Sequence, residues 1–144
     1  MIASDWPILR GQTLKRQELH ALVGGSHQWG ITSCLGGTNI LVFTNPRSAK
    51  KFGYDIFEGL QRTGIYTYTG QGQVGDQSVE AGSNRTLLST QWTGRPIRLF
   101  RVDRTEVTYF GRYRLSNVPF RYETAPDLTG VLRQVVVFNL HPDD

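Results

Sequence analysis

The chain has 144 residues, a mass of 16.3 kDa and a formal net charge of +4, a length that suits one domain (1–144) rather than two. No apolar run approaches the ~20 residues of a membrane span, and the N-terminus lacks the apolar stretch of a signal peptide. The one cysteine, Cys34, excludes an internal disulfide and a cysteine-based zinc site. We therefore expect a soluble, cytoplasmic, single-domain protein.

The basic residues are mostly arginine, at 13 of the 16 Lys and Arg residues. The planar guanidinium group suits phosphates and base edges, and it stacks on aromatic rings. A basic domain rich in Arg and Tyr makes nucleic acid a natural partner. The alternative is ordinary solvated surface charge.

The first half of the chain predicts one helix and two strands. A helix is expected over 13–23, with Thr13 as its cap and two glycines after its end. The apolar run 40–44 (ILVFT) predicts a buried strand, and 45–53 favours one or two helical turns. The alternation in IYTYTG predicts a strand with Tyr66 and Tyr68 on one face.

The second half predicts one helix followed by strands. The segment 83–92 reads as a helix capped by Ser83, and strands are expected over 97–102, 106–115 and 133–140. Turn residues over 117–129 predict a long loop. The whole pattern indicates an α+β, mainly β fold with five or six strands and two or three short helices, as a curved sheet or partly open barrel.

No complete catalytic set is visible, so neither an enzyme nor a bound cofactor or metal ion is expected. The segment Gly70–Gly75 matches GxGxxG, but the DQSVEAGSN that follows cannot form the helix of a dinucleotide site. The three histidines stand in unrelated contexts. A flexible glycine turn is what remains of this motif.

One group of residues has the chemistry to hold an extruded base. Tyr54 and Asp55 precede Tyr66, Tyr68 and the glycine turn. Aromatic rings stack on a base, whereas a carboxylate accepts hydrogen bonds from the exocyclic amine of cytosine. The alternative is that these tyrosines only pack in the core.

The segment FGYDIFEGLQRTGIYTYTGQGQVGDQSVEAGSNRTLL resembles the signature of the SRA (SET- and RING-associated, or YDG) domain, with its TYTG, DQ and NR elements. The opening RGQTLKRQELHALVGGSHQWGI and the closing VTYFGRYRL and RQVVVFNL are similar to the bacterial branch, found beside nuclease domains in modification-dependent restriction systems. The resemblance covers nearly the whole chain. It implies a crescent-shaped, partly open β-barrel with flanking helices that flips 5-methylcytosine out of duplex DNA.

The resemblance also implies roles for single residues. Tyr68 would stack on the flipped base, and Tyr54 would form the opposite wall. Thr69 and Gly70 would offer backbone amides, and Gln71 would lie near the methyl group. The carboxylate at the base edge would be Asp55 or Glu58.

Further residues are candidates for contact with the rest of the DNA. Trp29, in the loop GGSHQWGI, is a candidate wedge for the space that the flipped base leaves, with His27 and Gln28 beside it. The candidates for phosphate contacts are Arg10, Lys15, Arg16, Lys50, Lys51 and Arg85. Each of these could equally be a packing residue or a surface charge.

The function expected from the sequence is binding of methylated double-stranded DNA without catalysis, together with a nuclease domain or protein. Two alternatives stay open: an enzyme acting on modified DNA, such as a nuclease or glycosylase, and a barrel-type binder of RNA or single strands. The members that read CpG have a long loop between the glycine turn and the DQ pair. Here only three residues separate Gly72 from Asp76, so little dependence on sequence context is expected.

Overall fold

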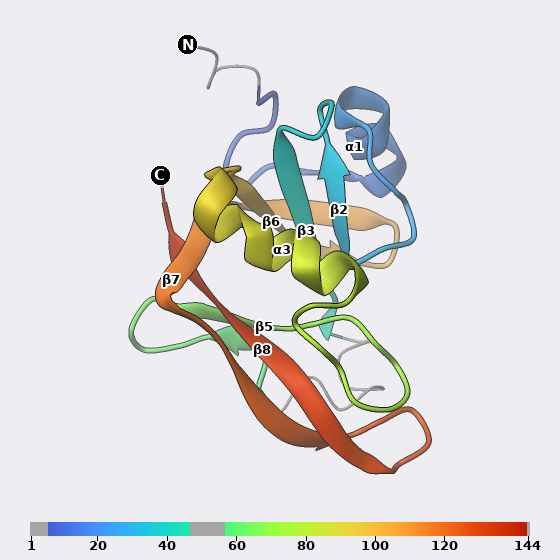
Figure 1. Cartoon of the computed structure of the whole chain (residues 1–144). Coiled ribbons are helices and arrows are strands. Elements are labelled where there is room, and N and C mark those ends of the chain that lie inside the picture. The colour runs from blue at the N-terminus through green and yellow to red at the C-terminus, as the bar shows by residue number, and fades with distance from the viewer. Residues whose placement is uncertain (1–5, 47–56, 144) are drawn as a thin grey trace.

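The computed structural model describes residues 6–46 and 57–143, which form one mixed sheet flanked by two helices (Figure 1). In chain order the elements are β1 (Thr13–Lys15), α1 (Arg16–Val23), β2 (Ile31–Cys34), β3 (Asn39–Thr44), β4 (Gly59–Leu60), β5 (Tyr66–Thr69), α3 (Gly82–Thr93), β6 (Ile97–Asp103), β7 (Glu106–Pro126) and β8 (Leu132–Pro142). The expected class, mainly β with few short helices, is confirmed. The eight strands exceed the five or six predicted, since β1 and β4 are too short to leave a sequence pattern.

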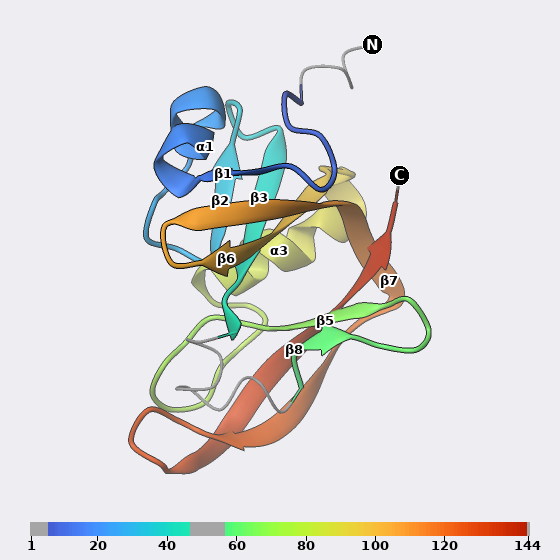
Figure 2. The same cartoon turned by 180° about the vertical axis from the view of Figure 1, so that it is seen from behind.

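The sheet has the strand order β2-β3-β6-β7-β8-β5-β4, and β1 pairs with β7 outside this path. Among the described strand pairs, only β3 and β6 run parallel, and the others are antiparallel. Since β2 and β4 remain as edges of the described sheet, it curves without closing into a barrel. Figure 2 shows β2 and β3 in the upper part of the molecule and the long ribbon of β7 and β8 running to its lower end, with β5 across it.

Strand β3 is buried on both faces, which explains its uninterrupted apolar sequence. Ile40 and Val42 pack in one core cluster with Leu87 of α3. Leu41 and Phe43 pack in a second cluster with side chains of α1 and β6. The two helices therefore cover opposite faces of this part of the sheet, as Figure 1 shows.

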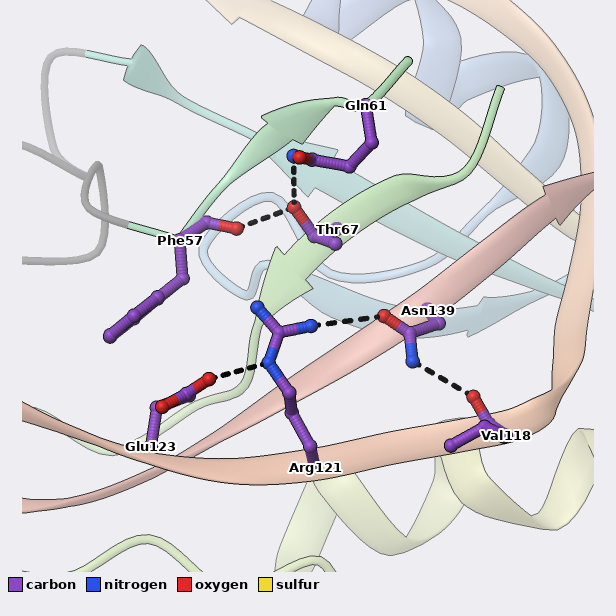
Figure 3. Close-up of polar contacts among 7 residues, drawn as sticks. All are labelled: Phe57, Gln61, Thr67, Val118, Arg121, Glu123 and Asn139. Atoms are coloured by element: carbon purple, nitrogen blue, oxygen red, sulfur yellow. Dashed lines mark hydrogen bonds and ion pairs between the residues drawn. The ribbon is translucent and has the colours of Figure 1, made fainter. Parts of the chain in front are cut away.

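Strand β5 has the alternation that its sequence predicts. Tyr68 is buried in the first core cluster, with Tyr66 packed against that cluster. Thr67 points the other way, where its hydroxyl donates to the carbonyl of Phe57 and accepts from Gln61 Nε2 at 3.1 Å (Figure 3). One face of β5 thus packs in the hydrophobic core, and the other makes hydrogen bonds to Phe57 and Gln61.

The long loop expected over 117–129 is wrong, because β7 continues to Pro126. The turn residues mark an irregularity in the β7–β8 pairing between Leu115 and Phe120. Asn139 of β8 donates from Nδ2 to the carbonyl of Val118 there, at 2.9 Å (Figure 3). A side chain thus satisfies backbone that the ladder leaves unpaired, and the true turn comes later, at 127–131.

Both predicted helix caps are also wrong. Thr13 belongs to β1, which pairs with β7, and α1 begins at Arg16. Ala81 occupies the cap position of α3, so Ser83 lies inside the helix. Residues 47–53 of the expected helical turns lie outside the described part of the chain. No helix in the described ranges is long and apolar enough to span a membrane.

Candidate nucleic-acid interface

The glycine turn that follows β5 is held by Gln77, of the DQ pair. Its Nε2 donates to the carbonyls of Gly70 at 2.8 Å and Gly72 at 3.0 Å. Its Oε1 accepts from the amide of Val136 in β8 at 2.9 Å. Gln77 is buried, so this side chain substitutes for a ladder partner and fixes the turn against the sheet.

Asn84, of the NR pair, holds the same turn from the first turn of α3. Its Oδ1 accepts from the amide of Gln71 at 2.7 Å, and its Nδ2 donates to the carbonyls of Gln71 at 3.0 Å and Ser78 at 3.1 Å. A Cβ on Gly70 would lie 2.7 Å from this Oδ1, so only glycine fits. Sequence reasoning assigned no role to Asn84 or Gln77, although both stand in the SRA-like signature.

The turn is also tied to the tip of the β7–β8 hairpin. Asp127 Oδ2 accepts from the amide of Gly75 at 3.3 Å, and the amide of Leu128 donates to the carbonyl of Gln73 at 3.0 Å. Arg133 donates from Nη1 to the carbonyl of Gly75 at 3.0 Å. Hydrogen bonds, chiefly from the Thr129 hydroxyl, lower the pKa of Asp127 to about 2, so it stays ionised here.

Tyr68 and Gln71 lie together at the end of β5. Gln71 Nε2 donates to the Tyr68 hydroxyl at 3.1 Å. A Cβ on Gly30 would lie 2.6 Å from that hydroxyl and 2.8 Å from Gln71 Nε2. The backbone at Gly30 therefore lies close to the Tyr68 hydroxyl and the Gln71 side-chain amide, with no room for a larger side chain. Tyr68 itself is only 2% exposed.

A carboxylate does lie beside the end of β5, and it belongs to Glu58. Its Oε1 accepts from the amide of Thr69 at 3.0 Å, and its Oε2 accepts from the hydroxyl of Thr44 at 2.8 Å. Of the two acids expected at the base edge, this is the described one: Asp55, like Tyr54, lies outside the described residues.

The backbone amides expected to face a base are engaged within the protein. The amide of Thr69 donates to Glu58, and that of Gly70 donates to the carbonyl of Val136 at 2.8 Å. The bond from Gly70 continues the antiparallel pairing of β5 and β8, which the sequence alone does not show. In this structure the amide hydrogens of Thr69 and Gly70 are therefore already donated within the protein.

The loop over residues 24–30, called here the Trp29 loop, is organised by Arg16. Its Nη2 donates to the carbonyls of Trp29 at 2.8 Å and Ser26 at 3.2 Å, and its Nε donates to His20 Nε2 at 3.1 Å. The guanidinium carbon lies 3.9 Å from the centroid of the Phe43 ring. Burial lowers the pKa of Arg16.

The side chains of this loop remain accessible. Trp29 is 59% exposed, and Gln28 and His27 are also exposed. The His27 ring stacks on His20, with centroids 4.5 Å apart and planes inclined by 21°. The loop therefore combines a fixed backbone with an exposed indole.

A cavity of about 510 Å³ lies between the Trp29 loop, the glycine turn and the start of α3. Its lining combines the Trp29 indole and an isoleucine with side-chain amides; the residues are Trp29, Ile31, Gln71, Gly72, Asp76, Gln77, Ser78, Ala81, Gly82, Ser83 and Asn84. The cavity is thus lined by both Trp29, the predicted wedge, and Gln71, the residue predicted to lie near the methyl group.

The other predicted phosphate contacts are not gathered at one place. Lys15 and Arg10 are exposed at the N-terminal side, and Arg85 is exposed on α3. Lys50 and Lys51 lie outside the described residues. Within the described ranges, no group of three or more His, Cys, Asp or Glu side chains is placed to hold a metal ion.

Solved structures with similar folds include SRA domains and modification-dependent restriction endonucleases. The sulfur-binding and SRA domains of ScoMcrA in complex with phosphorothioated DNA match with a TM-score of 0.73 and 22% identity, over 94% of this chain and 40% of that chain. The SUVH5 SRA domain bound to fully hydroxymethylated CG DNA matches with 0.65 and 20%, over 99% and 94%. The DNA modification-dependent restriction endonuclease AspBHI matches with 0.64 and 15%, over 88% and 37%.

The chain thus spans well under half of the ScoMcrA chain that it resembles, which is larger than one SRA domain. No curated protein matches the sequence. The family model described as "ScoMcrA-like, SRA domain" matches residues 10–144. This match includes both helices and all eight strands, and the chain therefore belongs to the ScoMcrA-like SRA domain family.

Proposed function

We propose that this domain binds duplex DNA that contains 5-methylcytosine, by flipping the modified base against Tyr68. The observation that carries the proposal is the position of the Glu58 carboxylate, 3.0 Å from the amide of Thr69, the residue next to Tyr68. An ionised carboxylate has about four acceptor positions. It is the group that the exocyclic amine of cytosine needs, and thymine offers no donor there.

The energetics require contacts beyond the base. Extrusion costs a few kcal/mol and stacking returns about 1–3 kcal/mol per base, so phosphate contacts supply much of the remaining affinity. Because Tyr68 is 2% exposed in the free domain, its neighbours must move aside for the base. The Trp29 indole fills the space that the base leaves.

The domain acts in this proposal as a binding module, and a nuclease domain or protein supplies cleavage. Two similar structures support it: ScoMcrA is described with phosphorothioated DNA, and the SUVH5 domain with hydroxymethylated DNA. A DNA-binding module of the cytoplasm needs neither cofactor nor membrane. An enzyme acting on modified DNA remains the second candidate, and incubation of the domain with methylated duplex and Mg²⁺ reveals any product.

The test compares two duplexes that differ only in one 5-methylcytosine. The domain should prefer the methylated duplex, and Glu58→Gln should reduce the preference about tenfold, since a good base-edge contact is worth about 1–3 kcal/mol. Tyr68→Ala should remove most of it and leave weak, salt-sensitive binding. Tyr68→Phe, which retains the ring, is the matched control and should retain the preference. Equal affinity of the unaltered domain for both duplexes would falsify the proposal.

A further inference from the structure

A second hollow, of about 300 Å³, lies on the N-terminal half of α3. Its lining supplies two guanidinium groups and three hydroxyls, and none of these described residues is acidic; they are Ser33, Gly82, Arg85, Thr86, Ser89 and Arg95. Gly82 lines both this hollow and the cavity beside Trp29. The two hollows therefore adjoin, at the start of α3 and along β2.

Arg95 is held at the hollow by hydrogen bonds to three acceptors, two in α3 and one in the turn between β2 and β3. Its Nη2 donates to the Ser89 hydroxyl at 2.9 Å, and its Nη1 donates to the carbonyl of Gly37 at 3.3 Å. Its Nε donates to the Thr93 hydroxyl at 3.3 Å. All of these acceptors are neutral, so the positive charge of Arg95 is fixed in place but not neutralised by them.

Arg85 brings a second positive charge to the same hollow. The side chain is exposed, and in the described part of the chain no hydrogen bond or ion pair holds it. Arg85 and Ser89 are four residues apart on α3, so both lie on one face of the helix. Two like charges around a hollow repel each other, and an anion between them relieves this repulsion.

The start of α3 contributes in the same direction. The helix has twelve residues, no acidic residue in its first turn and no side-chain hydrogen bond at its cap. The first backbone amides of such a helix carry partial positive charge and favour an anion. This effect adds to that of the two arginines.

We propose that this hollow binds a phosphate of the DNA backbone, beside the nucleotide that the Trp29 loop contacts. Arginine pairs with phosphate through two parallel hydrogen bonds, and hydroxyls donate to the remaining oxygens. The identity of DNA as the ligand rests on the proposed function. The contact itself does not depend on modification, since phosphates carry no sequence information.

The first test measures how affinity for unmodified duplex depends on salt. Each phosphate contact contributes about 0.9 to the slope of log K against log salt. Because both arginines act on one phosphate, Arg85→Ala should lower the slope by up to about one, and adding Arg95→Ala should bring the total decrease to about one. Arg62→Ala, an exposed arginine in the β4–β5 turn, is the control and should leave the slope unchanged. Because the Arg85 side chain makes no hydrogen bond or ion pair in the described part of the chain, its variant should keep the fold even where loss of Arg95 weakens it.

The second test places a single uncharged methylphosphonate at successive backbone positions around the 5-methylcytosine. The unaltered domain should lose affinity at one position or two, and Arg85→Ala should show no additional loss there. An unchanged salt slope for Arg85→Ala, or an equal methylphosphonate effect in both proteins, overturns the phosphate site and leaves the proposed function standing. A lower slope for Arg85→Ala, in a domain without any preference for methylated DNA, supports the phosphate site and overturns the proposed function.

Discussion

Arg16 Nη2 donates a hydrogen bond to the carbonyl oxygen of Trp29 at 2.8 Å. This bond ties the first residue of α1 to a loop that carries an exposed indole, and a second bond from Nη2 reaches the carbonyl of Ser26. The guanidinium stacks on Phe43 of β3. Such a geometry favours a positioning role for Arg16 over the phosphate contact expected from the sequence.

Comparison with its exposed neighbour Lys15 separates the two roles. Arg16→Ala should lower the free energy of unfolding by about 1–3 kcal/mol, because the hydrogen bonds of the charged guanidinium to Ser26, Trp29 and His20 are lost. It should also weaken binding of methylated duplex without changing the salt slope. Lys15→Ala should leave stability unchanged, and any loss of DNA affinity should come with a lower slope. Urea unfolding and titrations at several salt concentrations measure both effects. A lower slope for Arg16→Ala, at unchanged stability, would contradict the positioning role.

We expect the stability of the domain to depend on pH through His20, which accepts a hydrogen bond from Arg16. Its Nε2 accepts from Arg16 and its Nδ1 contacts the carbonyl of Gly24 at 2.7 Å, which requires a neutral ring with the proton on Nδ1. Burial lowers the pKa of His20 below 6.5, and the charges of Arg16 and His27 act in the same direction, against the hydrogen bond to Gly24.

Because the folded pKa is lowered, the contribution of His20 to stability is complete above its ordinary pKa of 6.5. It declines as the pH falls below 6.5 toward the folded value. We expect the unfolding midpoint to fall between pH 7.5 and pH 5.5, and the fall to be smaller in His20→Gln. His141→Gln, at the far end of the chain, serves as the control. The same pH dependence in His20→Gln as in the unaltered domain would exclude this origin.

The sequence predicts the elements whose pattern is local. The apolar run 40–44 and the alternation of β5 are confirmed as strands. The turn signals at Asn117 and Pro119 predict a loop that does not form, because the irregularity they cause is absorbed within the β7–β8 pairing. Local sequence does not distinguish a bulge in a long hairpin from a loop that ends one.

The site was predicted less completely, since its key contacts join segments far apart in the chain. Gln77 binds Val136 across 59 residues of sequence, and Arg133 binds Gly75 across 58 residues. A polar residue in a signature could contact a ligand or hold the backbone that does. Only the tertiary structure shows that Gln77 and Asn84 hold the glycine turn.

The close approach of the Trp29 loop to β5 can be tested at Gly30. A Cβ there would lie 2.6 Å from the Tyr68 hydroxyl, so Gly30→Ala should cost about 1–3 kcal/mol of stability through overpacking. Tyr68→Phe removes the hydroxyl and should cost about 0.5–1.5 kcal/mol alone. The double variant should then be more stable than the sum of the two losses predicts. Urea unfolding of the unaltered domain, the two single variants and the double variant gives the coupling free energy between the two positions. Strictly additive losses of stability would show that the added Cβ does not clash with the Tyr68 hydroxyl.

The clamp on the glycine turn can be tested with an isosteric change, Asn84→Asp. The carboxylate still accepts from the amide of Gln71, but it cannot donate to the carbonyls of Gln71 and Ser78. Two buried acceptors then face a negative charge, and we expect a loss of about 1–3 kcal/mol in stability. The preference for methylated DNA should fall as well. Ser83→Ala, beside it on α3, is the control. An unchanged preference in Asn84→Asp would show that the turn does not shape the base site.

The short segment 73–75 limits how much DNA sequence the domain can inspect. It is bound to the tip of the β7–β8 hairpin through Leu128 and Asp127. Even released and extended, three residues span about 10 Å at ~3.3–3.6 Å per residue. The major groove is about 12 Å wide and about 8.5 Å deep. Because both ends of the segment are fixed to the fold, it can project by only about half of its extended length, or about 5 Å, which is too short to contact the neighbouring base pair or the opposite strand.

We therefore expect similar affinity for 5-methylcytosine in CpG, CpA, CpT and CpC contexts, and no strong preference for hemimethylated over fully methylated sites. Because no direct contact reaches the following base pair, the binding free energies for the four contexts should differ by well below the ~1–3 kcal/mol that such a contact gives. Titrations of four duplexes that differ only at the following base pair measure it, with unmodified duplexes as controls. A tenfold preference for CpG would assign sequence reading to another element, and Trp29→Ala would then show whether the exposed indole performs it. Loss of the CpG preference in that variant would identify the Trp29 loop as the reader, because no phosphate contact is altered by the change.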